Sequence, residues 1–306
     1  MPASTPPAVS LVVISYEMAR VLPRTILSLL PPYQRDIDPA DIEILVIDNG
    51  SAAPPPSDAF GPMGSRVRVL SANPASPSPV AAINQGLDLA QADLVGVFID
   101  GARLASPGLL TACLAAARLH PRPVVATINY QLGPGLQYQT VPNGYGPETE
   151  DALLASIAWP DADGYRLFGI AACELRAGPA GPMLESNALF MPRVLWRELG
   201  GYDPAFTEPG GGVVNPDTLS RACRLPGVQL IRILGEGTFH QYHGGLSTST
   251  PESAIRTLQQ GSRAYLRRRG RPLAPVRQVG WLFDGPRREL ITTPTDREVL
   301  ASCPAA

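Results

Sequence analysis

The sequence lacks lysine altogether, and it is poor in cysteine, histidine and aromatic residues. Its basic residues are 25 arginines, which face 27 acidic residues and leave a formal net charge of −2 at pH 7. A nearly neutral chain has no general attraction for polyanions, so no nucleic-acid partner is expected. The cysteines include no C-x-x-C pair, which argues against a zinc site or a disulfide framework and fits a reducing cytoplasm. They are Cys113, Cys173, Cys223 and Cys303.

Long apolar runs are missing as well. No stretch approaches about 18 consecutive apolar residues, the length that a membrane-spanning helix requires. The opening segment, MPASTPPAVS, has no basic part followed by an apolar part, so a secretory signal is not predicted either. The expected location is therefore the cytoplasm, with peripheral contact at the inner face of the membrane left open.

A glycine-rich turn is absent where two large classes of nucleotide-dependent enzymes need one. Residues 15–20, which follow the first apolar run, read SYEMAR and contain no glycine. A dinucleotide-dependent oxidoreductase requires G-x-G-x-x-G at this point, and a nucleotidyltransferase requires a glycine-rich phosphate loop. Both classes are therefore disfavoured.

The sequence does contain short apolar runs that alternate with segments of helical spacing. In a chain of 306 residues that is 44% hydrophobic, this pattern predicts a large α/β core with a mostly parallel sheet. The apolar runs are Val9–Ser15, Ile42–Ile47, Arg66–Leu70, Leu94–Ile99 and Val124–Ile128. The helical segments between them are Arg20–Leu30, Val80–Ala90 and Pro107–His120. Ligands of such sheets bind beyond the carboxyl ends of the strands.

The second half of the chain has a different character. Residues 129–184 are rich in Gly, Pro, Tyr and Gln, which predicts a loop-rich region with one helix at Glu148–Ile157. Ordered elements are expected again after it. They are strands at Ala188–Met191, Gln229–Leu234 and Gly237–Tyr242, and helices at Pro192–Leu199, Pro216–Arg224 and Pro251–Arg268.

Polar residues follow the apolar runs at the positions where a ligand is expected. Asp48 opens an Asp-Asn-Gly-Ser turn that can hold a nucleoside, although the same four residues also form common surface turns. Asp100 follows a buried strand, where a carboxylate can ligate a divalent cation that bridges a diphosphate. Asp100 can equally cap the segment that follows it. Each motif is weak alone, and their order along the chain is more specific.

Taken together, SLVVISYE, IEILVIDNGS and AAINQGLDLAQADLVGVFIDGA resemble the nucleotide-binding half of family 2 glycosyltransferases, and ESNALFMPRVLWRELGGYDPAF resembles the acceptor side of that family. The resemblance implies the GT-A fold, a Rossmann-like, mostly parallel sheet flanked by helices with an acceptor-side α+β half. It also implies inverting transfer of a sugar from a nucleotide-diphosphate donor, in most relatives a UDP sugar, to a carbohydrate or lipid-linked acceptor, as in polysaccharide biosynthesis.

The resemblance divides the chain into three regions and assigns a donor site. The regions are a nucleotide-sugar-binding half (1–130), an acceptor-binding half (131–250) and a C-terminal helical tail (251–306). The implied donor-binding residues are Ser15, Tyr16, Glu17, Asp48, Asn84, Gly86, Asp100, Gly101 and Arg103. The family usually has a second acid where this chain has Ala102. Metal dependence is therefore open, and Arg103 is expected to supply part of the missing charge neutralisation.

Two histidines extend the expected metal site. Relatives often place a histidine after a late strand as a metal ligand, which here implies His240 and His243, and imidazole suits Mn²⁺ better than Mg²⁺. On one strand these two would face opposite sides, so both converge only if the strand ends between them. The alternative is a structural histidine held by hydrogen bonds.

The base that inversion requires is less clear. The family's acid falls on Asn215 here, and an amide cannot remove a proton at neutral pH. Asp217 is the first candidate, followed by Glu185 and Asp203, although Asp217 also suits a helix N-terminus. Because Ala102 and Asn215 replace two expected carboxylates, a non-catalytic sugar-nucleotide-binding protein on the same fold remains the alternative.

Overall fold

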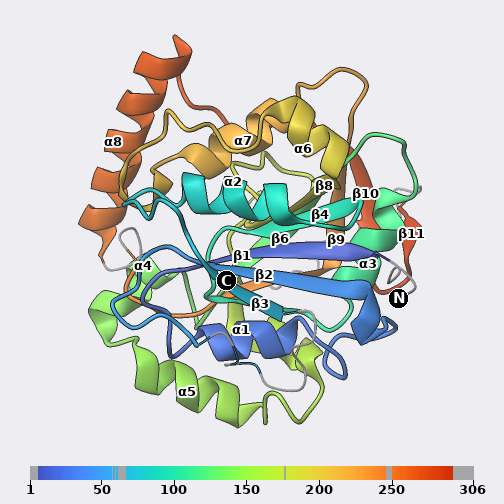
Figure 1. The fold of residues 1–306 in the computed structure, drawn as a ribbon. Coiled ribbons are helices and arrows are strands. Elements are labelled where there is room, and N and C mark those ends of the chain that lie inside the picture. The colour runs from blue at the N-terminus through green and yellow to red at the C-terminus, as the bar shows by residue number, and fades with distance from the viewer. Residues whose placement is uncertain are drawn as a thin grey trace.

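The computed structural model describes residues 6–56, 58, 60, 67–175, 177–245 and 250–291. Residues 1–5 of the opening segment, Arg66 at the head of the third apolar run, and Cys303 lie outside these ranges. Figure 1 shows one twisted sheet that runs through the centre of the molecule, with helices above and below it. The expected α/β architecture is confirmed.

Within the described residues the sheet has eleven strands, of which nine form the order β11-β10-β9-β6-β8-β4-β1-β2-β3. β1 pairs in parallel with β2 and β4, and β8 is the antiparallel strand inserted between β4 and β6. The strands of the first half are β1(Val9–Ser15), β2(Ile42–Asp48), β3(Val67–Ser71), β4(Leu94–Phe98), β5(Arg103–Ala105) and β6(Pro123–Leu132). Those of the second half are β7(Ala171–Cys173), β8(Ala188–Pro192), β9(Gln229–His240), β10(Trp281–Asp284) and β11(Glu289–Leu290).

Side chains of β1 alternate between two hydrophobic cores because successive residues of a strand point to opposite faces. Leu11 and Val13 pack with α1(Leu22–Ser28) and α3(Leu109–Ala117) on one face. Val12 and Ile14 pack with α2(Val80–Leu89), α6(Arg193–Leu199) and α7(Val214–Ala222) on the other. Burial on both faces explains why these strands are apolar along their whole length.

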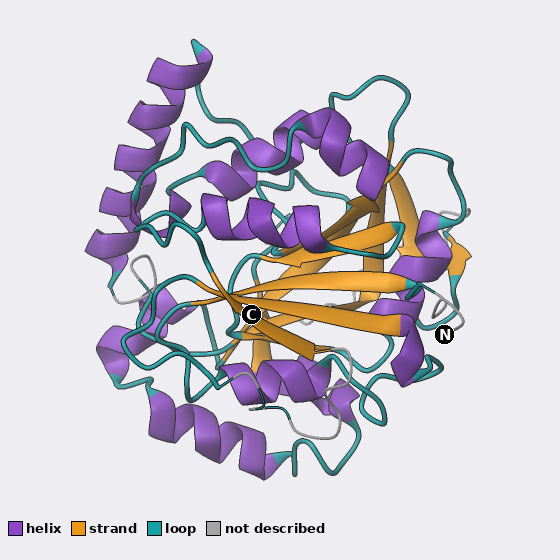
Figure 2. Cartoon of the chain, in the orientation of Figure 1, coloured by secondary structure: helices purple, strands orange, loops and turns teal. Residues whose placement is uncertain are grey.

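Residues 129–184 are more ordered than expected. β6 continues to Leu132, and α4(Gln137–Thr140) and α5(Pro147–Ser156) follow it. Short 3-10 helices occur at Val141–Asn143 and Gly164–Ile170, as they do at Pro39–Asp41 and Pro209–Gly211 in other loops. Long loops separate these pieces, as Figure 2 shows. The boundary expected at residue 130 falls inside β6, so the two predicted halves share one sheet.

Three expectations about single elements are wrong. The two strands predicted at 229–234 and 237–242 form one strand, β9, in which Gly235 has a φ of 74° and the register with β6 shifts. The helix predicted from Pro107 begins two residues later, at Leu109, and the Ser106 side chain before it donates to Glu236. The C-terminal region contains α8(Pro251–Arg269) and also two strands, β10 and β11.

No helix within the described ranges is both long and apolar enough to cross a membrane.

Candidate active site

Three neighbouring strands bring the predicted nucleotide-binding segments to one edge of the sheet. In the parallel register, Ser15 of β1 lies opposite Asp48 of β2, and Val13 of β1 lies opposite Phe98 of β4. Asp100 follows Phe98 by two residues and therefore emerges beside the end of β1, at the same edge as Asp48. The shared edge expected for the two acids is confirmed.

The Asp48 turn is held together by its own carboxylate. Asp48 accepts hydrogen bonds from the backbone nitrogens of Gly50 and Ser51 at 3.1 and 3.0 Å, and from Ser51 Oγ at 2.6 Å. Glu17 ties the end of β1 to this turn, because its backbone nitrogen donates to Ser51 Oγ and its carboxylate accepts from Ala52 N. The two strand-end loops thus form one unit, in which Asp48 is buried.

The other predicted residues at the strand ends, Ser15, Tyr16 and Gly101, differ in whether they expose a side chain. Ser15 is buried, and its carbonyl accepts a hydrogen bond from Asn49 N at 2.8 Å. Gly101 passes beneath α1, where its carbonyl accepts from Thr25 Oγ1 at 2.8 Å. Tyr16 is 55% exposed. Of the three predicted contacts Ser15, Tyr16 and Gly101, Tyr16 is the one with a side chain turned to solvent.

Asn84 and Gly86 on α2, two predicted donor-binding residues, both have packing roles. The Asn84 amide donates to Tyr202 O at 2.8 Å and accepts from Tyr202 N at 2.9 Å, which joins α2 to the Gly-Gly-Tyr-Asp segment. At Gly86 a Cβ atom would lie 2.4 Å from Val12 Cγ1, so glycine allows α2 to lie directly on β1. The two residues fix α2 in place.

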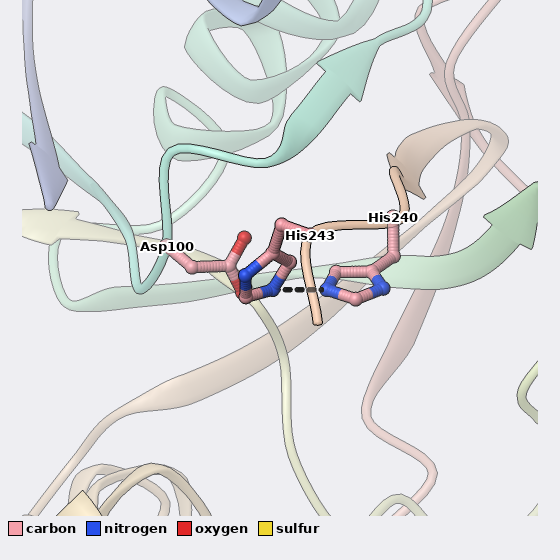
Figure 3. Close-up of side chains that lie close together, drawn as sticks. All are labelled: Asp100, His240 and His243. Atoms are coloured by element: carbon pink, nitrogen blue, oxygen red, sulfur yellow. Dashed lines mark hydrogen bonds between the residues drawn. The ribbon is translucent and has the colours of Figure 1, made fainter. Parts of the chain in front are cut away.

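Asp100, His240 and His243 form a candidate metal site beside these loops. Each offers one ligand atom, and the three atoms lie within 4.8 Å of one another. Figure 3 shows the Asp100 carboxylate and both imidazoles turned toward a common point. β9 ends at His240, so the chain turns back and His243 reaches the same side, with 3.1 Å between the two Nε2 atoms. The condition for convergence of the two histidines is met.

The protonation states of this group suit a cation. Gln137 Oε1 lies 3.0 Å from His240 Nδ1, which places the proton on Nδ1 and leaves the Nε2 lone pair facing the site. Burial and the charge of Arg103 lower the pKa of His240, and burial also lowers the pKa of His243. Burial opposes ionisation of Asp100, but the charge of Arg103, together with the hydrogen bond from Ala102 N, favours it, and the pKa of Asp100 is lowered to about 2. The site combines one carboxylate with two neutral imidazoles.

Ala102 cannot be replaced by the usual second acid without disturbing buried structure. Its side chain is fully buried, its nitrogen donates to Asp100 Oδ1, and its carbonyl accepts from Gln241 N at 2.7 Å. Arg103 Nε donates to Asp100 Oδ2 at 3.0 Å, and its terminal nitrogens lie 3.0 and 3.2 Å from the amide oxygen of Asn187. Arg103 therefore orients the Asp100 carboxylate.

Hydrogen bonds with a buried glutamate and a partly buried arginine fix the loop that carries His243. Glu150 of α5 is fully buried and accepts from Tyr242 N at 2.5 Å, while Arg20 donates to both Glu150 and the carbonyl of Tyr242 at 2.8 Å. Tyr145 Oη adds a hydrogen bond to Glu150 at 3.2 Å. The residue before His243 is thus held by both of its backbone groups.

Glu185 belongs to the same network as Asp100. Asn215 donates to Glu185 Oε2 at 2.9 Å, and its side chain lies beside that of Asn187, whose amide oxygen faces Arg103. Glu185 is half-buried, and burial followed by the charge of Glu174 raises its pKa. A partly accessible carboxylate with a raised pKa is suited to accept a proton.

Asp217 and Asp203 lie in a different cluster. Asp217 is fully buried and accepts from Arg221 Nε at 2.8 Å and from Arg269 Nε and Nη2 at 2.7 Å. Asp203 accepts from Arg269 Nη2 at 2.5 Å. These ion pairs fasten the end of α8 to α7, and guanidinium groups occupy both carboxylate oxygens of Asp217. Among the described residues, Asp217 and Asp203 are held in ion pairs, whereas Glu185 is in none.

Gln137, Asn187 and Glu150 were not identified from the sequence. Gln137 acts on a histidine more than a hundred residues further along the chain, and Glu150 acts on a loop at a similar distance. No motif marks such pairs. Asn187 lies two residues after Glu185, in a segment that the family resemblance covers. Of these three residues, it is the one that the sequence could have identified, from its position in that segment.

The sequence profile described as "Glycosyl transferase family 2" matches residues 10–166, which are more than half of the chain. The chain belongs to this family and has the GT-A fold. A comparison with curated proteins gives no match.

Two solved structures are similar to this chain at low sequence identity, and the first of them shares its fold. The mannosyltransferase PcManGT from Pyrobaculum calidifontis, in complex with GDP-Man and Mn²⁺, is 15% identical with a TM-score of 0.52, and the alignment covers 86% of this chain and 65% of that one. S. aureus TarS 1-349 in complex with UDP-GlcNAc is 15% identical with a TM-score of 0.49, covering 84% of this chain and 66% of that one. The chain thus spans slightly less than two thirds of each neighbour.

Proposed function

We propose that this glycosyltransferase inverts the anomeric centre as it moves a sugar from a nucleotide-diphosphate donor, in the first instance a UDP sugar, to a carbohydrate or lipid-linked acceptor. The observation that carries the proposal is the convergence of Asp100, His240 and His243 at the strand edge that also bears the Asp48 turn. In open α/β sheets this edge is where nucleotides bind.

The three side chains fit a divalent cation such as Mn²⁺. One hard carboxylate oxygen and two imidazole nitrogens form a ligand set that this ion accepts, and the hydrogen bond from His240 Nδ1 to Gln137 supports the orientation of one ligand. When bound, such an ion would neutralise charge on the diphosphate leaving group. Arg103 holds Asp100 in place for this role, and Asn187 in turn holds Arg103.

Glu185 is the proposed base. Inversion requires a carboxylate that takes the proton of the acceptor hydroxyl while the oxygen attacks the anomeric carbon opposite the leaving nucleotide. Asn215 occupies the family's usual base position but donates to Glu185 Oε2, which leaves the second oxygen, Oε1, for the acceptor. We therefore infer that Asn215 positions the base instead of serving as one.

The second candidate function is sugar-nucleotide binding without transfer. Asn215 at the base position and buried Ala102 at the second acid position favour it. In that case the donor site would remain intact, and Glu185 would stabilise the loop without taking a proton.

Separate measurements of binding and turnover decide between the two functions. Thermal shifts with UDP, GDP, dTDP and CMP, each with and without Mn²⁺, identify the nucleotide, because a ligand of the native state raises the melting temperature. Donor hydrolysis and transfer to a panel of saccharide and lipid-linked acceptors are then measured with the matching sugars. Metal-dependent binding with turnover supports the proposal. Binding with no turnover of any donor supports the second function.

Glu185→Gln tests the base, with Glu174→Gln as the matched control. The first change removes the proton acceptor but preserves shape, so turnover falls while donor affinity stays the same. The control removes the neighbouring acid, whose charge helps to raise the pKa of Glu185, and retains a base. Full transfer by Glu185→Gln would reject Glu185 as the base.

A further inference from the structure

Helix α8 carries a two-part exposed surface that the donor site does not use. Ile255, Leu258 and Leu266 are 56%, 50% and 49% exposed, and their spacing of three and eight residues places them on one side of the helix. Arg256, Arg263 and Arg267, spaced by seven and four residues, are also exposed and form an adjacent strip. We name these six residues the α8 surface.

The exposure does not reflect a loosely attached helix. On the opposite side, Gly261 packs against Val213, where a Cβ atom would approach Val213 Cγ1 to 2.6 Å, and Tyr265 is buried beside Phe206. Arg269 is fastened by its ion pairs to Asp203 and Asp217. The N-terminus is closed by a capping box of Thr250 and Ser253. The α8 surface is thus presented by a well-anchored helix.

The charge of this region is opposite to that of the chain as a whole. Residues 251–277 contain seven arginines and one acid, Glu252, although the whole chain has a net charge of −2. Arg268 and Arg269 are paired with acids of the body of the protein. Among the described residues, Arg256, Arg263 and Arg267 take part in no salt bridge. Three free cations therefore lie beside three exposed aliphatic side chains.

Apolar side chains next to a basic strip are the features with which a surface helix enters the headgroup region of an anionic bilayer. We propose that the α8 surface docks this protein on an anionic phospholipid membrane. Charge complementarity selects this occupant. A second copy of the chain that paired through the same face would set arginines against arginines, which is unfavourable.

The location of α8 gives the docking a consequence for the active site. α8 contacts α4, whose Gln137 holds the candidate metal ligand His240. Figure 1 shows α8 and α4 on the same side of the molecule. Docking would thus bring the strand-edge site near the bilayer, where a lipid-linked acceptor exposes its head group. That consequence rests on the proposed function, whereas the docking itself does not.

Vesicle sedimentation of the full chain, without donor or metal, tests the proposal. The vesicles contain equal parts of phosphatidylglycerol and phosphatidylcholine, or phosphatidylcholine alone. We expect binding to the anionic vesicles, weaker binding to the neutral ones, and loss of binding as NaCl is raised from about 0.1 M to about 1 M. Equal binding to both vesicle types, or no binding to either, would overturn the proposal.

Two double variants test the arginine strip and the aliphatic side chains of the α8 surface separately. Arg256→Gln with Arg263→Gln should weaken binding to anionic vesicles about 25-fold, since one basic residue near such a surface contributes roughly fivefold. Ile255→Ser with Leu258→Ser should weaken binding to both vesicle types. The matched control is Val194→Ser with Arg197→Gln on α6, an exposed aliphatic and arginine pair on another helix, and it should bind as the native protein does.

All variants change exposed side chains and should melt as the native protein does. Gel filtration in the absence of lipid excludes the alternative occupant. If the α8 variants change from dimer to monomer while vesicle binding is unaffected, the surface is an interface between copies and the membrane proposal is wrong. Donor binding, followed by thermal shift, should be the same in all of them, so a failure of the proposed function is seen separately.

Discussion

Gln137 and His240 contact each other at two points, although 103 positions separate them. Gln137 Oε1 lies 3.0 Å from the ring nitrogen Nδ1, and Gln137 Nε2 donates to the carbonyl of His240 at 3.2 Å. Gln137 is fully buried. One side chain thus fixes both the backbone and the ring of the proposed metal ligand, and so determines which nitrogen faces Asp100 and His243.

Gln137→Ala should therefore lower the affinity for Mn²⁺ by about 10- to 100-fold, the usual loss when a partner of a ligating histidine is removed. The measurement is isothermal titration of the protein with Mn²⁺. Gln139→Ala, an exposed glutamine on the same short helix, is the control and should bind as the native protein does. Equal affinity in both variants would show that His240 is positioned without Gln137.

Asp217→Asn should act on stability before it acts on chemistry. The change leaves Arg269 and Arg221 without their buried charged partner, which should cost about 2–4 kcal/mol of unfolding free energy, given that both arginines are partly exposed. Urea unfolding measures the loss. Asp203→Asn is the control with a smaller expected effect, because Asp203 is itself partly exposed. A stable Asp217→Asn protein that has lost transfer would restore Asp217 as the base.

The pH dependence of turnover should report Glu185. Its carboxylate must be ionised to take a proton, and burial followed by the charge of Glu174 raises its pKa. Turnover should therefore rise with pH through a midpoint above the usual value for glutamate. In Glu174→Gln this limb should move to lower pH. An acidic limb that is unchanged in Glu174→Gln would assign the titration to another group.

The raised pKa of Glu185 also makes the stability of the protein depend on pH. A raised pKa in the folded state means that protonated Glu185 is favoured there, so its contribution is complete below the unfolded pKa and is lost as pH rises through the folded pKa. Glu185→Gln should therefore unfold with a weaker dependence on pH across this window than the native protein.

Gly86→Ala tests the packing of α2 on β1. The added Cβ would lie 2.4 Å from Val12 Cγ1, so the helix must shift, and we expect a loss of about 1–3 kcal/mol despite the better helix propensity of alanine. Gly169→Ala, where the added methyl group meets nothing within 4 Å, should unfold like the native protein. Chemical denaturation compares the two. If Gly86→Ala is stabilised, the close approach of α2 and β1 is relaxed in solution.

The sequence predicted the first half of the fold well for a physical reason. Strands such as Val9–Ser15 and Ile42–Asp48 are buried on both faces, and their apolar runs have clear ends. β9 was divided wrongly because Gly235 interrupts the pattern without ending the strand. β10 and β11 were missed because strands of four and two residues leave little periodicity in a segment rich in Pro, Gly and Arg.

The candidate site, like the fold, was predicted where a local sequence pattern exists and missed where none does. Asp100, His240 and His243 belong to motifs near strand ends, and their ligand atoms do lie close together in the structure. Asp217 was ranked first from its distance to Arg221 along the chain, but Arg269, which the sequence does not link to it, occupies its second face. Contacts between distant segments decide which acid is accessible, and such contacts leave no local pattern.

The most direct test of the account is UDP binding as a function of Mn²⁺, in the native protein and in His243→Ala. If Asp100, His240 and His243 hold the cation at the nucleotide edge, Mn²⁺ should tighten UDP binding to the native protein, and His243→Ala should keep the weak, metal-independent binding but lose most of the increase. A UDP affinity that does not change with Mn²⁺, or an increase that His243→Ala retains in full, would contradict the account.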